Sequence, residues 1–74
     1  MTREEITKAV QEAFQGHSVA VVGEKNTENM QLYRVMISGN SFSLDDFYRL
    51  SMIDYDIRVL VESNVLTLTL FKQV

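Results

Sequence analysis

The sequence lacks cysteine altogether, and its apolar residues never gather into a long run. Without thiols the chain can form neither a disulfide nor a thiolate metal site, which suits a reducing compartment such as the cytoplasm. The longest apolar stretch is the four residues 19–22, far short of the roughly 20 that span a bilayer. We therefore expect a cytoplasmic protein that is not inserted in a membrane.

Positive charge is scarce as well. Seven Lys and Arg stand against ten Asp and Glu, which gives a net charge of −3. The seven cations are spread along the chain, whereas a protein that binds nucleic acid through its phosphates needs them gathered. The first 14 residues are charged and amphipathic, unlike a secretory signal or a transit peptide. We therefore expect an acidic protein that does not bind nucleic acid through its phosphates.

Residues that commonly perform chemistry are few. His17 is the one histidine, and Gly16, Gly23 and Gly39 are isolated, so no glycine-rich phosphate-binding loop is present. No serine lies in a G-x-S-x-G nucleophile elbow. A lone histidine just after a helix usually interacts with the helix dipole or lies at a strand edge. We therefore expect no enzyme activity, no cofactor and no metal.

What the sequence does contain is an alternation of helix and strand patterns over residues 1–74, which indicates one domain. Thr2-Arg-Glu-Glu5 has the form of a capping box, in which the Thr and Glu side chains each bond to the other residue's backbone. An apolar stripe follows at helical spacing, formed by Ile6, Ala9, Val10, Ala13 and Phe14. Gly16 suits the left-handed position that ends a helix.

Two β-rich runs come next, residues 18–24 and 30–37, around the polar loop 25–29. A hairpin with this loop places Val19 opposite Val35 and Val21 opposite Tyr33. The pattern leaves open which face is buried. The two faces are formed by Val19, Val21, Tyr33, Val35 and Ile37 and by Ala20, Val22, Leu32, Arg34 and Met36.

After a break at Gly39-Asn40, Ser43 begins a second capping box and a short helix. The residues of this helix expected to face inward are Leu44, Phe47, Leu50 and Ser51.

The final runs, 57–62 and 65–72, flank a two-residue hairpin turn at Ser63-Asn64. This turn sets a register in which one face is aliphatic, because a slip by one residue would scatter those side chains. The aliphatic face pairs Ile57 with Leu70, Val59 with Leu68 and Val61 with Leu66, and the reverse face pairs Asp56 with Phe71, Arg58 with Thr69 and Leu60 with Thr67.

The predicted element order is therefore α-β-β-α-β-β, an α+β fold. The simplest architecture is a two-layer α/β sandwich with one four-stranded antiparallel sheet and both helices on one face. The opposite face of that sheet would remain partly apolar.

Four aspartates lie close together in sequence. Asp45 and Asp46 fall in the first turn of the second helix, where carboxylates stabilise the helix dipole and complete the cap. Asp54 and Asp56 fall in the turn before the third strand, roughly 12–15 Å away along the helix. One metal ion cannot bridge the two pairs, and no glycine follows Asp54-Tyr-Asp56 as a calcium loop would require.

Tyrosines lie among these carboxylates. Acidic neighbours would repel phosphate, which argues against base stacking on Tyr48 and Tyr55 and favours contact with a basic protein surface. The candidate partner-binding residues are therefore Tyr48, Asp54, Tyr55 and Asp56.

The leading hypothesis is a small, acidic, non-catalytic binding protein that acts through protein–protein contact. By compositional analogy with small phage and mobile-element proteins, anti-CRISPR inhibitors among them, the partner could be a basic host protein. The alternative is a structural homo-oligomeric domain that associates through a sheet face at Leu60, Val65 and Phe71, or through an edge strand such as 65–72. A metal- or nucleic-acid-binding module is a third hypothesis, against which the composition argues.

Overall fold

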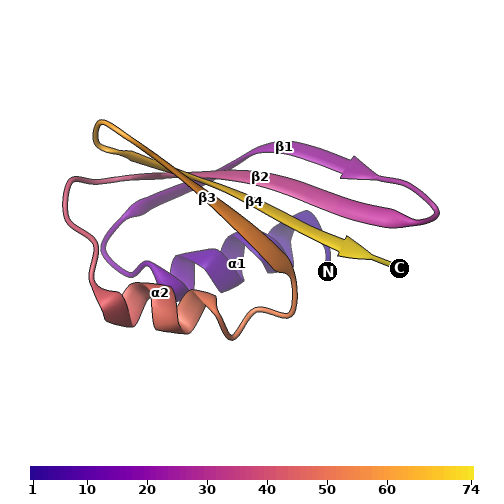
Figure 1. Ribbon diagram of the computed structural model, residues 1–74, viewed down its shortest axis with the longest axis horizontal. Helices are drawn as coiled ribbons and strands as arrows, with labels where there is room; N and C mark the ends of the chain where they lie inside the picture. Colours follow the sequence, from indigo (N-terminus) through magenta and orange to yellow (C-terminus); the bar gives the residue numbers. More distant parts are fainter.

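Residues 1–74, described by a computed structural model, form two helices and one four-stranded antiparallel sheet (Figure 1). Figure 1 shows both helices on the same side of the sheet, which confirms the predicted two-layer α+β architecture. The elements are α1 (Arg3–Ala13), β1 (Ser18–Asn26), β2 (Met30–Ser38), α2 (Leu44–Leu50), β3 (Asp56–Glu62) and β4 (Val65–Gln73).

The strand order across the sheet is β1-β2-β4-β3, so β1 and β3 are the edge strands. The prediction that residues 65–72 could form an edge is wrong, because β4 pairs with β2 as well as with β3. Its alternation of Leu and Thr suits this interior position, since Leu66, Leu68 and Leu70 all point into the core and are fully buried. Neither helix has the length and apolar character needed to cross a bilayer.

The capping box of α1 is confirmed. The Glu5 N–H donates to the Thr2 hydroxyl at 3.2 Å, and the Thr2 N–H donates to the Glu5 carboxylate at 2.8 Å. The predicted stripe then packs against the sheet, and Phe14 at its end is completely buried. The chain leaves the helix through Gly16, whose φ of +84° is the left-handed conformation expected there.

The first hairpin has a different register from the predicted one. Val19 lies opposite Ile37 and Val21 opposite Val35, and the register then shifts so that Val22 is the extra residue of a β-bulge. The buried face is the one that contains Val21, Val35 and Ile37.

The loop of this hairpin is also shorter than predicted, because Thr27 closes it. The Thr27 N–H donates to the Met30 carbonyl at 2.8 Å, and the Thr27 hydroxyl accepts the Met30 N–H at 3.1 Å. β1 therefore continues to Asn26, and the two extra residues account for much of the changed register.

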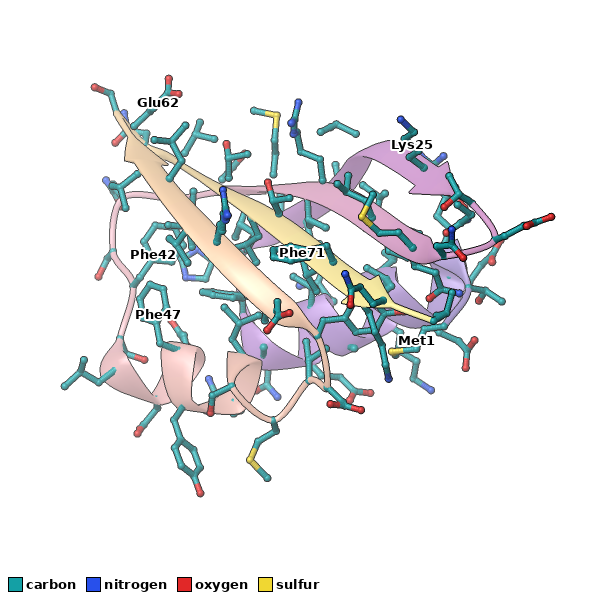
Figure 2. The ribbon with its side chains drawn as sticks, turned by 45° about the vertical axis from the view of Figure 1, so that its right-hand side comes forward. Met1, Lys25, Phe42, Phe47, Glu62 and Phe71 are labelled. Carbon is teal, nitrogen blue, oxygen red and sulfur yellow. The ribbon has the colours of Figure 1, made fainter.

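The register of the second hairpin is the predicted one at every pair. Asn64 takes the left-handed conformation that a tight turn requires, with φ of 61°. The inward leucines of β4 are buried, but Val59 and Val61 opposite them are 46% and 72% exposed. The tip of this hairpin, marked by Glu62, stands away from both helices (Figures 1 and 2), so the outer half of β3 has no cover.

The orientation of α2 differs from the predicted one. Leu50 is buried and Phe47 packs against the core, but Leu44 and Ser51 are exposed. Phe47 supports this orientation by packing edge-on against the Phe14 ring, with the ring centroids 5.7 Å apart. Figure 2 shows Phe42 and Phe47 between α2 and the sheet.

Candidate binding surfaces

The four aspartates have separate roles, and Asp46 is structural. Its carboxylate accepts the Ser43 N–H at 2.9 Å, the Ser43 hydroxyl accepts the Asp46 N–H at 3.2 Å, and the side chain is buried. Arg49 pairs with the same carboxylate at 2.7 Å. The bond from the Ser43 N–H, assisted by Arg49, holds the pKa of Asp46 below its usual range despite the opposing effect of desolvation.

Arg49 also connects the two helices. Its Nε donates to the Ala13 carbonyl oxygen at 3.1 Å, at the C-terminal end of α1 where carbonyls lack helical partners. The Asp46–Arg49–Ala13 chain therefore fixes the rotation of α2 about its axis. This tertiary contact turns Leu44 outward.

The predicted residues in the turn before β3 have different environments. Asp54 is exposed but pairs with Lys72 at 3.0 Å, and Asp56 is exposed at the start of β3. Tyr55 packs against the core and meets Tyr33 edge-on at 6.4 Å. Burial, followed by the proximity of Tyr33, raises the pKa of Tyr55.

Tyr48 and Tyr55 consequently do not share a surface. Tyr48 is 69% exposed on α2, whereas Tyr55 is half-buried and its hydroxyl donates to the side chain of Gln31, near the start of β2. Of the predicted set, only Tyr48 remains as an exposed aromatic side chain.

Tyr48 instead belongs to an exposed apolar stripe that runs along α2. Leu44, Tyr48 and Met52 are 87%, 69% and 72% exposed. Their spacing of four residues places them on one side of the helix, and Met52 continues this side in the following turn, where its N–H donates to the Arg49 carbonyl at 3.1 Å. We call these three residues the α2 stripe.

Two carboxylates border the α2 stripe. Asp45 is exposed next to Leu44, and Glu12 of α1 lines a shallow hollow next to Met52. The one cation in that hollow is Arg49, which is already paired with Asp46. The surface therefore combines large apolar side chains with a negative border.

His17 has a structural environment. Its ring stacks on Phe42 with the centroids 4.6 Å apart, and Nδ1 lies 3.2 Å from the Ser38 carbonyl oxygen. A Cβ atom at Gly39 would collide with the imidazole, so the glycine allows this close packing. No three His, Asp or Glu side chains converge as metal ligands would.

The predicted oligomer face also looks different in the structure. Leu60, Val65 and Phe71 do lie on the side of the sheet away from the helices, but only Leu60 is largely exposed. Phe71 is partly covered by the Arg58 guanidinium, 5.7 Å from the ring centroid. Between the apolar residues run the threonines of β4, so this face is mixed and not continuously apolar.

Sequence reasoning missed Leu44 and Met52 as surface residues. The available signal was an excess of large apolar residues in a short helix. Phe47 and Leu50 already fill the side that faces the core, and Leu44, Tyr48 and Met52 recur every four residues on another side. Comparison with family models, with curated proteins and with solved structures finds no match to this chain.

Proposed function

We propose that this protein is a non-catalytic, cytoplasmic binding protein whose α2 stripe docks into an apolar groove of another protein. One observation carries the proposal: Leu44, Tyr48 and Met52 are large side chains, more than two-thirds exposed, on one side of one helix. A helix that inserts such a stripe into a groove is a common recognition mode. Tyr and Met are also enriched where protein surfaces meet.

The energetic argument rests on the amount of apolar side chain left in water. Burying a Leu or Met side chain completely contributes about 1.5–3 kcal/mol. Leu44 and Met52 are therefore suitable anchors, and Tyr48 adds a large ring that loses little conformational freedom when it is held. The cost of association offsets part of this contribution, so these anchors support specific but moderate affinity.

The charge around the stripe favours a basic partner. Asp45 and Glu12 border the α2 stripe, and the whole chain carries a net charge of −3. A groove with a basic rim, such as the nucleic-acid-binding groove of a host protein, would complement this border and accelerate association. The protein would then act by occupying that groove.

The test compares a triple variant and a double variant of the full chain. Leu44→Ser/Tyr48→Ser/Met52→Ser removes the α2 stripe, and Val22→Ser/Met36→Ser removes exposed apolar side chains on other elements. Proteins captured from a lysate by the wild type are purified, and their affinity for each variant is measured at low salt. We expect the α2 variant to lose at least about tenfold in affinity and the control to keep it.

Equal affinity of both variants for the captured protein would contradict the proposal. Far-ultraviolet circular dichroism and the urea midpoint verify that each variant is folded, so that lost binding reports the stripe itself. Asp45→Asn/Glu12→Gln should reduce the salt dependence of binding if the partner's rim is basic.

A further inference from the structure

The two edges of the sheet differ in their protection. On β1 the bulge at Val22 interrupts the regular ladder, and Arg3 of α1 donates from Nη2 to the Val21 carbonyl oxygen at 2.9 Å. Bulges and covering side chains of this kind prevent an edge strand from pairing with another chain. The middle of β1 is therefore obstructed as an edge.

The other edge, β3, carries no such device. Its pairing with β4 is regular from Asp56 to Glu62, without a bulge, and the strand contains neither Pro nor Lys. Three consecutive aliphatic residues, Val59, Leu60 and Val61, are 46%, 56% and 72% exposed. Outside the β3–β4 ladder, no backbone hydrogen bond reaches residues 56–62, so the outward peptide groups have no partner in the chain.

We propose that two copies of this chain associate through β3. The two strands pair antiparallel about a two-fold axis perpendicular to the sheet, with Leu60 opposite Leu60 of the second copy, and the two sheets become one. This inference does not depend on the α2 stripe, which lies on a different element.

Symmetry limits the register to a few choices. Directly opposite residues of antiparallel strands point to the same face, so a symmetric pair must have one residue opposite its own copy at the centre. A centre at Arg58 would place two arginines face to face. A centre at Val59 would place Asp56 opposite Glu62 at both ends, and like charges directly opposite each other are destabilising.

A centre at Leu60 avoids these conflicts. Arg58 then lies opposite Glu62 of the second copy, twice by symmetry, and Val59 lies opposite Val61, also twice. Neither Arg58 nor Glu62 forms an ion pair within its own chain. A centre at Val61 would instead set Leu60 against Glu62. A centre at Ile57 would also set Asp56 against Arg58, but it would leave Val61 without a partner within β3. Charge complementarity and aliphatic pairing together therefore select the Leu60 centre.

The dimer also accounts for the side chains that the fold leaves uncovered. Val59 and Val61 project on the helix-facing side of β3 and Leu60 on the reverse side, so pairing gives both faces of the edge new apolar neighbours. The proposed dimer thus uses Leu60 from the expected oligomer face, together with the edge residues Val59 and Val61 in place of Val65 and Phe71.

Sedimentation velocity at low and high micromolar concentration tests the association. We expect the wild type to shift from monomer to dimer as its concentration rises, and Val61→Lys to stay monomeric because a charged edge residue opposes pairing. The matched control is Val22→Lys on β1, which should dimerise like the wild type. A wild type that is monomeric at every concentration, or a Val61→Lys variant that dimerises normally, would overturn the proposal.

Charge exchange tests the register. Arg58→Glu and Glu62→Arg should each raise the dimer dissociation constant by about tenfold, since each converts two attractive pairs into repulsive ones. The double variant Arg58→Glu/Glu62→Arg should restore the wild-type constant. Tighter dimerisation of Glu62→Arg alone would place Asp56 opposite residue 62 and overturn the Leu60-centred register. The variant that lacks the α2 stripe should dimerise normally, which separates this test from that of the proposed function.

Discussion

At the scale of single residues, Asp46 shows how one carboxylate can serve the cap of one helix and the contact between two. It accepts the Ser43 N–H and holds Arg49, which in turn reaches the Ala13 carbonyl. Because the pKa of Asp46 is lowered in the folded protein, its contribution to stability is present above its usual pKa and is lost as pH falls through the folded value.

We therefore expect Asp46→Asn to lower the free energy of unfolding by about 1 kcal/mol near neutral pH. The difference from the wild type should begin to shrink as pH falls below the usual aspartate pKa of about 4, and should vanish below the lowered pKa of Asp46 in the folded protein. Urea unfolding over a series of pH values measures this. Asp45→Asn removes the same charge at the neighbouring exposed position and serves as the control; a pH-independent difference for Asp46→Asn would contradict the prediction.

The pKa of Tyr55 is shifted in the opposite direction, which affects stability at alkaline pH. Burial raises its pKa, so the neutral phenol is favoured in the folded state and stability is lost as pH rises through the folded pKa. We expect absorbance titration near 295 nm to contain a step above the usual tyrosine value of about 10. Tyr55→Phe should remove that step, whereas Tyr48→Phe should leave it in place. If Tyr55→Phe still showed the high-pH step, that step would belong to another tyrosine and the prediction would be wrong.

At the scale of the elements, the same residue type has opposite roles on β4 and α2. Leu68 is completely buried on the central strand, whereas Leu44 is 87% exposed at the start of the helix. Removing a buried Leu side chain loses its transfer energy and leaves a cavity, while removing an exposed one does neither.

Leu68→Ala should therefore lower the free energy of unfolding by about 2–5 kcal/mol, and Leu44→Ala should change it by less than about 0.5 kcal/mol. Urea unfolding of both variants at one protein concentration measures the contrast, because the chemical deletion is identical. A large loss for Leu44→Ala would show that this side chain is buried, against the orientation of α2 described above.

The elements also show where sequence reasoning succeeds. The second hairpin was predictable because its two-residue turn and its aliphatic alternation specify one register together. The first hairpin was not, because the bulge at Val22 and the turn closed by Thr27 depend on local geometry that no hydrophobic pattern reveals. The orientation of α2 was likewise hidden, since a contact with Ala13, distant in sequence, determines it.

The candidate surface was predictable only in part for the same reason. Tyr48 was identifiable as part of an acidic, aromatic segment, but sequence proximity to Tyr55 does not imply a shared surface when one residue faces solvent and the other the core. The exposure of Val59 and Val61 also depends on how far the helices reach across the sheet, which strand patterns do not specify.

At the scale of the whole molecule, the two proposed surfaces lie on different elements and both helices lie on one side of the sheet. A two-fold axis perpendicular to the sheet keeps that side common to both copies. The dimer would therefore present two α2 stripes on the same side. Two linked binding surfaces raise the effective affinity for a partner that is itself repeated.

The hydrogen bond from Arg3 to the Val21 carbonyl has a consequence for how large such an assembly can become. A sheet with two open edges can add copies without limit and grow into a ribbon. Here the Arg3 side chain and the bulge at Val22 obstruct β1, so pairing through β3 would use the one regular edge. In the proposed dimer, assembly would then end at two chains, and the guanidinium of Arg3 would help to oppose polymerisation.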